Sequence, residues 1–286
     1  MFLPFVKANF TQLIRCTAVV CVTAISANLA AAADLPGMVP AKYKSAAIVI
    51  GTTATMAPVE SVDSATGEIV GFEPEFARAI GRKLNVKIEI QNVAWDGLLA
   101  GMQAGRFDIA MSGITDSVQR QQAMDFVDWY SSGTKMVVAK GNPRKVNGLD
   151  TLCGLTLGGV RGTSFYKAME AAASKCGSKE TPLIATESTP AGVLLLKTGR
   201  ADVLALDALA SVGILKANPD LESATASRIN PDIHGVAFAK GNAALRDAWQ
   251  AGLKAIIESG EYDEILKRFD SSEVAYKKAS VNAGAQ

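Results

Sequence analysis

The segment "GRFDIAMSGIT" at Gly105–Thr115 is informative about the fold, because a similar segment, "GRADVLALDAL", occurs at Gly199–Leu209. Both follow an amphipathic helical pattern and begin with Gly-Arg-x-Asp before a β-branched residue. In each, an apolar strand pattern ends in polar residues: Ser112 and Thr115 in the first, Asp207 in the second. Two α/β units of similar plan are therefore predicted, although short helix-to-strand joints also recur by chance.

A second, shorter repeat supports the same interpretation. The sequence "AKGN" occurs at 139–142 and again at 239–242, each time after a short apolar run. Each copy has the composition of a strand that ends in a glycine-containing turn. Taken together, the two repeats favour a chain with two lobes.

The residues around the first repeat alternate between strand and helix patterns. The segment at 46–58 predicts a buried strand followed by a loop. Segments 71–84 and 94–107 carry apolar residues at helical spacing, with Gly105 where a helix end usually falls. Segment 85–93 alternates as a strand. This order predicts a mostly parallel α/β sheet flanked by helices.

The bulk composition fits a folded chain with a hydrophobic core. Of its 286 residues, 49% are hydrophobic and 20% are charged, which allows one large domain or two small ones. The net charge is +1, so no basic field indicates nucleic acid as a partner.

Residues 1–33 have the pattern of a secretory signal peptide. Lys7 and Arg15 precede a short apolar run, and the small residues at 31–33 predict cleavage before Asp34. A membrane anchor is the alternative, but the apolar run is shorter than the roughly 20 residues that span a bilayer. A lipid anchor at Cys21 is disfavoured because the preceding Val20 is bulky.

Two cysteines, Cys153 and Cys176, remain after removal of the signal peptide. An exported protein favours their pairing in a disulfide, and two buried thiols are the alternative. No Cys-x-x-Cys occurs and His234 is the only histidine, so we expect no metal site.

Four loops are the candidates for a binding site. Ligands of open parallel sheets lie outside the carboxyl ends of the strands. That rule selects Thr52–Pro58, Ser112–Arg120, Gly159–Tyr166 and Leu206–Ala210, two loops from each half. If the halves face each other, these loops converge on one cleft.

The polar groups in those loops suit an α-amino acid. Arg120 offers a planar fork of donors for a carboxylate, and Asp207 offers a negative charge for an ammonium. Ser112 and Thr115 add hydroxyls. Two structural alternatives remain: Arg120 as an ordinary helix-surface arginine, and Asp207 as the cap of a helix that begins at Ala208.

Six segments carry a resemblance to a known family: "IGTTATMAPVES", "GFEPEFARAIGRKL", "WDGLLAGMQAGRFDIAMSGITDSVQRQQAMDFVDWYSSG", "VRGTSFY", "GRADVLALDALA" and "GNAALRDAWQAGLKAIIESGEYDEILKRF". Through these segments, from about Ala46 to Phe269, the chain resembles the extracytoplasmic solute-binding proteins of polar amino-acid ABC transporters, bacterial solute-binding protein family 3. The resemblance implies a two-lobed periplasmic binding protein fold of type II, in which each lobe has a mostly parallel sheet and two hinge strands join the lobes. The two "AKGN" copies would end those strands. Lobe 1 would comprise 34–138 plus 240–286, and lobe 2 would comprise 139–239.

The resemblance also implies roles for individual residues. Arg120 would bind the α-carboxylate, helped by Thr163 or Ser164 and by the backbone at Thr115. Asp207 would take the α-ammonium, with Ser112 and the Gly113 carbonyl nearby. The remaining candidates for the pocket wall are Met56, Thr53 and Trp95.

Four positions concern the ligand side chain or the pocket wall around it. Met56 stands where many relatives carry an aromatic ring, and Val59 stands where a ring is also common. Relatives that bind basic amino acids often carry an acid at the position of Thr53, so its absence argues against a cationic ligand. Trp95 fits a pocket wall and a core position equally well.

The implied function is capture of an amino acid in the periplasm by a protein that needs no cofactor. The protein would be a monomer that delivers its ligand to ABC-transporter permease subunits. One alternative is an enzyme of the same fold resembling cyclohexadienyl or arogenate dehydratases, with Glu170 or Glu187 as acid. That alternative is disfavoured because His234 has no partner in the sequence pattern. A second is a ligand-presenting sensory protein. We expect the small, polar tail at 272–286 to fray.

Overall fold

The computed structural model describes residues 1–2 and 34–285. The predicted signal peptide therefore lies outside the described residues, apart from Met1 and Phe2. Within the described ranges, no helix has the length and apolar character needed to cross a membrane.

The main sheet within residues 34–285 has nine strands in the order β5-β1-β6-β12-β7-β10-β8-β9, and β11 pairs with β7. A second sheet, in the order β2-β3-β4, lies between β1 and the first long helix in the sequence. The strands of the main sheet are β1 (Ile48–Thr52), β5 (Ile88–Asn92), β6 (Ile109–Ala110), β7 (Met124–Ala139), β8 (Leu157–Val160), β9 (Leu183–Thr186), β10 (Val203–Asp207), β11 (Leu221–Ser223) and β12 (Ile229–Ala239). Those of the second are β2 (Thr55–Met56), β3 (Glu60–Val62) and β4 (Ile69–Val70).

The predicted parallel pairing is present on both sides of the main sheet. Strand β1 is parallel to β5 and β6, and β8 is parallel to β9 and β10. The long strands β7 and β12 join these sides and are antiparallel to each other. The fold is therefore the predicted two-lobed α/β architecture, with two strands that connect its halves.

The "AKGN" repeat marks the ends of the connecting strands, as predicted. Strand β7 ends at Ala139 and β12 ends at Ala239. Gly141 and Gly241 then adopt φ values of +82° and +89°, which glycine reaches without steric cost. In the antiparallel register, Ala239 is opposite Met124, the first residue of β7. The two turns therefore lie at opposite ends of the β7–β12 pair.

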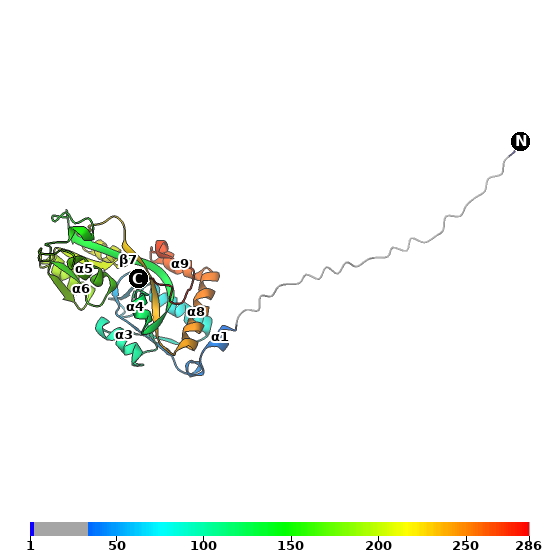
Figure 1. Cartoon of the computed structure of the whole chain (residues 1–286). Helices are drawn as coiled ribbons and strands as arrows, with labels where there is room; N and C mark the ends of the chain where they lie inside the picture. Colours follow the sequence, from blue (N-terminus) through cyan, green and yellow to red (C-terminus); the bar gives the residue numbers. More distant parts are fainter. Residues whose placement is uncertain (3–33, 286) are drawn as a thin grey trace. The chain divides into compact units, whose positions relative to one another are not determined.

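Helices flank the sheet on both sides of this pair. In Figure 1, α5 and α6 lie towards one end of the β7 strand, and α8 and α9 lie towards the other. The α-helices are α1 (Leu35–Met38), α2 (Phe72–Leu84), α3 (Trp95–Gln103), α4 (Val118–Gln121), α5 (Ser164–Ala173), α6 (Thr189–Lys197), α7 (Ala208–Ala217), α8 (Ala243–Glu258) and α9 (Glu261–Arg268). Short 3-10 helices occur at η1 (Ala41–Lys44), η2 (Leu149–Thr151) and η3 (Ser272–Val274).

Helix α2 shows how the local sequence fixes an element next to the site. Acidic residues occupy its first turn and basic residues its last, which complements the helix dipole. Phe72, Phe76 and Ile80 are buried on one face, and Phe76 stacks on Tyr262 with ring centroids 4.6 Å apart. Asn85 ends the helix in the left-handed conformation, with φ of 52°. This packing fixes Glu73, in the first turn, below the candidate site.

The C-terminal tail differs from the prediction of a frayed segment. Ala275 and Val281 form bridges to β7. The Asn282 side chain makes two hydrogen bonds to the same strand: its Oδ1 accepts from Phe126 N at 2.7 Å and its Nδ2 donates to Asp125 at 3.0 Å. The tail also binds two buried acids: Gly284 N donates to Asp116 at 2.7 Å, and Ser280 Oγ donates to Asp128 at 2.8 Å. The sequence could not show this, because the acids that hold the tail lie more than a hundred residues away.

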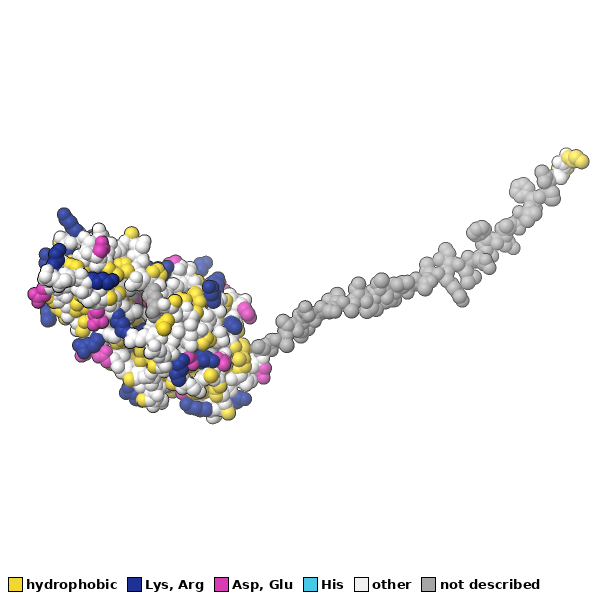
Figure 2. Space-filling model, viewed as in Figure 1, with side chains coloured by type: hydrophobic (Ala, Val, Ile, Leu, Met, Phe, Trp, Pro, Cys, Tyr) yellow, Lys and Arg dark blue, Asp and Glu magenta, His cyan; other side chains and the backbone are white. Residues whose placement is uncertain are grey.

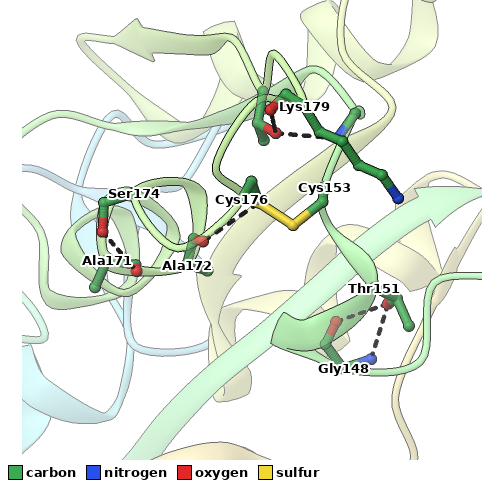
Figure 3. Close-up of a disulfide and its surroundings, with 10 residues drawn as sticks. Gly148, Thr151, Cys153, Ala171, Ala172, Ser174, Cys176 and Lys179 are labelled. Carbon is green, nitrogen blue, oxygen red and sulfur yellow. Dashed lines mark hydrogen bonds between the residues drawn. A yellow bond between two sulfur atoms is a disulfide. The ribbon is translucent and has the colours of Figure 1, made fainter.

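The predicted disulfide between Cys153 and Cys176 is confirmed. It joins the segment after η2 to the turn that follows α5, as Figure 3 shows. Both elements lie in the half of the sheet that contains β8 and β9.

We expect the double variant Cys153→Ser/Cys176→Ser to lose about 3 kcal/mol of unfolding free energy and to melt about 8 °C lower, because the bridge restricts the unfolded chain. The bridged cysteines are 23 residues apart in sequence. Differential scanning calorimetry measures the change. As a control, a reductant should lower the Tm of the wild type but leave that of the variant unchanged. An unchanged wild-type Tm under reducing conditions contradicts the expectation.

Charges are mixed over the surface. On the face shown in Figure 2, lysine and arginine side chains are interspersed with aspartate and glutamate. This distribution agrees with the net charge of +1.

Candidate functional site

A cavity of about 410 Å³ lies where the carboxyl ends of strands from both halves meet. Nine of the ten residues predicted to bind ligand line it, and Asp207 does not. The predicted residues in the lining are Thr53, Met56, Trp95, Ser112, Gly113, Thr115, Arg120, Thr163 and Ser164. Val59, whose position also concerned the ligand side chain, is instead fully buried in the core.

Arg120 forms a cationic part of the cavity wall rather than an ordinary surface position. Its guanidinium donates to the carbonyls of Thr115 at 2.9 Å and of Gly162 at 3.1 Å. It also lies over the Trp95 ring, 5.8 Å from the centroid. Burial is the main cause that lowers its pKa, to about 10, and Asp232 and Asp116 oppose this effect. The group therefore remains charged at neutral pH.

Hydroxyl groups surround Arg120. Thr115 Oγ1 lies 2.8 Å from Ser164 Oγ, which connects the loop after β6 to the start of α5. Thr163 caps α5, because its hydroxyl accepts from Tyr166 N at 3.1 Å and donates to Val160 O at 2.7 Å. The Thr163 hydroxyl hydrogen is therefore already used within its own loop, whereas Ser164 contacts Thr115 and lines the cavity.

Trp95 belongs to both the cavity wall and the core. Its ring lines the cavity and packs against the hydrophobic clusters around Phe165 and Phe107. Its indole Nε1 donates to the Arg161 carbonyl at 2.9 Å. The two roles that the sequence left open are thus combined in one side chain.

Asp207 lies behind the cavity, and its alternative role as a helix cap is confirmed. It precedes α7, and its Oδ1 accepts from Leu209 N at 2.9 Å and from Ala210 N at 3.0 Å. Its Oδ2 lies 3.7 Å from His234 Nε2, and the side chain is almost fully buried. Burial is the main cause that raises the pKa of Asp207, while His234 lowers it. Its predicted contact with a ligand ammonium stays a prediction.

The conclusion that His234 lacks a partner is wrong. Its Nδ1 lies 2.9 Å from the Tyr130 hydroxyl, and its Nε2 lies 3.1 Å from Asp232 Oδ1 and 3.4 Å from Thr115 Oγ1. Burial alone would lower the pKa of His234, but Asp232 and Asp207 more than offset it, so the pKa is raised. A signal was present in the sequence, since Asp232 and His234 are two residues apart and share one face of a strand.

Two buried glutamates below the cavity were also missed. Ser112 Oγ donates to Glu60 Oε1 at 2.7 Å, and Thr53 Oγ1 lies 2.7 Å from Ser112 Oγ. The Glu73 carboxylate accepts from Gly113 N at 3.2 Å and from Trp129 Nε1 at 3.2 Å. Burial raises the pKa of Glu73 to about 7 and raises that of Glu60 well above its ordinary range. Each glutamate has apolar neighbours in the sequence, and no local pattern there indicates that the two side chains lie below the cavity.

Two further acids, Glu170 and Glu187, are the candidate acids of the dehydratase alternative. Among the residues that the structure describes, Glu187 is the only acid in the lining and is exposed, whereas Glu170 is outside the lining. Over the same residues, no group of three or more His, Cys, Asp or Glu side chains could hold a metal ion.

The comparisons with known proteins assign the chain to a family. A sequence model described as bacterial extracellular solute-binding proteins, family 3, matches residues 48–271. The chain belongs to this family. The match covers the whole of the cavity lining.

Individual relatives agree with that assignment. The chain is 32% identical over 229 residues to a probable histidine-binding protein of Neisseria gonorrhoeae, which covers 78% of this chain and 83% of that protein. It is 26% identical over 228 residues to the L-cystine-binding protein TcyJ of Escherichia coli (strain K12), covering 79% and 84%. Among solved structures, the arginine-, lysine-, histidine-binding protein ArtJ from Geobacillus stearothermophilus matches with a TM-score of 0.70 and 30% identity, covering 78% of this chain and 95% of that one.

Proposed function

We propose that this solute-binding protein captures an amino acid in the cavity and delivers it to the permease subunits of an ABC transporter. The observation that carries the proposal is the Arg120 guanidinium, which lies in the cavity wall among hydroxyl groups. The family match supports it, as do relatives named for binding histidine, cystine or arginine. In this proposal the protein acts as a monomer in the periplasm, after export directed by residues 1–33.

Arg120 has the capacity to bind the ligand carboxylate. A guanidinium carries five N–H donors, and the carbonyls of Thr115 and Gly162 use two of them. The rest can form a charge-assisted pair with a carboxylate. The Ser164 hydroxyl lies in the same lining, where it donates to Thr115 Oγ1 because Thr115 donates its own hydrogen to Asp232 Oδ2 at 3.0 Å. The ligand ammonium would then lie towards Thr53, Ser112 and the negative charge of Asp207.

Closure of the two lobes about β7 and β12 accounts for capture. In the proposed division, lobe 1 comprises 34–138 plus 240–286 and lobe 2 comprises 139–239. The hydrogen bonds from Arg120 to Gly162, from Trp95 to Arg161 and between Thr115 and Ser164 all cross that division. A ligand that bridges the same surfaces would favour the closed form, because it binds that form more tightly.

We propose further that the chain is not an enzyme. The dehydratase alternative needs an acid positioned over the substrate, and the candidate in the lining, Glu187, is exposed. Incubation with prephenate tests this point, since formation of phenylpyruvate would favour the enzyme.

A thermal-shift screen tests the binding function. We expect at least one amino acid to raise the Tm by about 10 °C, since a ligand at about 1,000 times its Kd stabilises the folded state by about 4 kcal/mol. The panel should contain L-histidine, L-arginine, L-lysine and L-cystine, together with the uncharged polar and small aliphatic amino acids that Thr53 favours. Decarboxylated analogues such as histamine and agmatine are the controls and should give no shift. The proposal fails if no amino acid raises the Tm.

A further inference from the structure

The hydroxyl groups of Thr53 and Ser112 belong to a hydrogen-bonded chain that ends on buried acids. Ser112 Oγ donates its single hydrogen to Glu60 Oε1 at 2.7 Å. The same oxygen accepts from Thr53 N at 3.3 Å and lies 2.7 Å from Thr53 Oγ1. Because the Ser112 hydrogen is already used, Thr53 must be the donor in that last contact. Each hydroxyl therefore donates towards Glu60.

This direction determines what Thr53 can offer to a ligand. A threonine hydroxyl has one hydrogen and two lone pairs. Its hydrogen is directed to Ser112 Oγ at 2.7 Å, because the other acceptors near it, Thr55 Oγ1 at 3.4 Å and Glu60 Oε1 at 3.5 Å, are farther away. Thr53 lines the cavity. It therefore meets a ligand as a hydrogen-bond acceptor, and this part of the wall suits an N–H group.

Glu73 prevents the chain from reversing. Reversal would require Glu60 to carry a proton on Oε1 and donate it to Ser112. No hydroxyl or N–H group of the described residues donates to the other oxygen, Glu60 Oε2, and burial together with the charge of Glu73 raises the pKa of Glu60. Two neighbouring buried carboxyl groups share a proton, because both cannot be charged there.

The donors around the pair place the negative charge on Glu73. Its carboxylate accepts from Gly113 N and Trp129 Nε1, whereas Glu60 accepts from hydroxyl groups alone. With the shared proton between the two acids, Glu60 Oε1 remains free to accept from Ser112. The other titratable groups that act on the pair are Asp207 of β10, His234 of β12 and Tyr130 of β7.

We propose that Glu60, held by Glu73, is a positioning residue that turns the Ser112 and Thr53 hydroxyls into an acceptor wall for a charged N–H group of the ligand. The proposal rests on the proposed amino-acid-binding function. A cationic group of the ligand can then donate a hydrogen bond to the Thr53 hydroxyl, although position 53 carries no acid. The absence of an acid at position 53 is then no evidence against a cationic ligand.

Two variants of Glu60 test the direction of the hydrogen bonds. Glu60→Gln keeps an acceptor for Ser112 and supplies an N–H for Glu73, so we expect it to bind L-histidine, L-arginine and L-cystine within about threefold of wild type. Glu60→Met has a similar length but no acceptor, so Ser112 and Thr53 can turn their hydrogens towards the cavity. We expect it to weaken binding of any probe that the wild type binds by about tenfold or more. Isothermal titration calorimetry measures both.

The ligand-free protein supplies a readout that is independent of binding. The pKa values of Glu60 and Glu73 lie above the ordinary value of 4.5 in the folded protein, that of Glu73 at about 7. The shared proton therefore stabilises the fold below the ordinary value, and this stabilisation is lost as the pH rises through the raised values. The amide N–H of Glu60→Gln replaces the shared proton and does not titrate. Its Tm should therefore fall less than that of wild type between about pH 5 and about pH 9.

The outcomes separate this proposal from the proposed function. Wild-type binding by Glu60→Met, or loss of binding by Glu60→Gln, overturns the positioning role. Equal pH profiles of Tm in wild type and Glu60→Gln overturn the shared proton. A wild type that binds none of these three probes overturns the ligand part of this inference, and one that binds no amino acid overturns the proposed function as well. In both cases the pH profiles still decide the arrangement of the two acids.

Discussion

Replacing Arg120 with alanine is expected to weaken amino-acid binding by about two to four decades in Kd. The change leaves a ligand carboxylate without its partner in a largely desolvated cavity, a loss of about 3–5 kcal/mol at about 1.4 kcal/mol per decade. Arg120→Lys should recover only part of this, because an ammonium lacks the planar fork of donors. Calorimetric titration with the amino acid that gives the largest thermal shift provides the Kd.

The control for Arg120→Ala is Arg200→Ala, which also removes one positive charge. Arg200 is exposed and lies outside the cavity lining. It should bind like the wild type. Circular dichroism and the ligand-free Tm show whether each variant is folded. If folded Arg120→Ala binds the amino acid as tightly as Arg200→Ala does, the assignment of the carboxylate site is wrong.

The elements and the location of the cavity could be predicted because their signals are local. Strand β1, helix α2 and the turn at Gly105, which has φ of +72°, each follow from a few adjacent residues. The rule that ligands lie at the carboxyl ends of parallel strands then selects the loops. The rule correctly placed Arg120, Ser112 and Ser164 in one cavity, although no local sequence pattern connects the first two residues to Ser164.

The groups behind the cavity could not be predicted in this way. The acceptor for Ser112 is Glu60, 52 residues away, and a partner of Glu73 is Trp129, 56 residues away. A buried acid is tolerated only because such partners satisfy it, and partners that are distant in sequence leave no spacing to detect. The same reason explains the error about the tail, whose order depends on Asp116 and Asp128.

Asp207 is the residue for which the local pattern and the family resemblance suggested different roles. The first role, as the cap of α7, is present in the structure. The second, an electrostatic contact with the ligand ammonium, depends on the charge of the side chain rather than on its shape. Substitutions that remove the charge alone, or the charge and the cap together, therefore separate the two roles.

We expect Asp207→Ala to lower the free energy of unfolding by about 3 kcal/mol, because it removes a helix cap worth up to about 2 kcal/mol and a buried partner of His234. Asp207→Asn keeps an acceptor for Leu209 N and Ala210 N, so it should lose about 1 kcal/mol or less. Urea denaturation monitored by circular dichroism measures both. Equal stability of the two variants contradicts the capping role.

Binding by the asparagine variant then decides the electrostatic role. Since this variant retains the cap, a loss of affinity cannot be attributed to a displaced α7. We expect its Kd for the amino acid to rise by about tenfold or more, because the negative charge behind Thr115 and His234 is gone while the fold is retained. Wild-type affinity in this variant would show that the negative charge of Asp207 does not contribute to binding, and that Asp207 serves the fold alone.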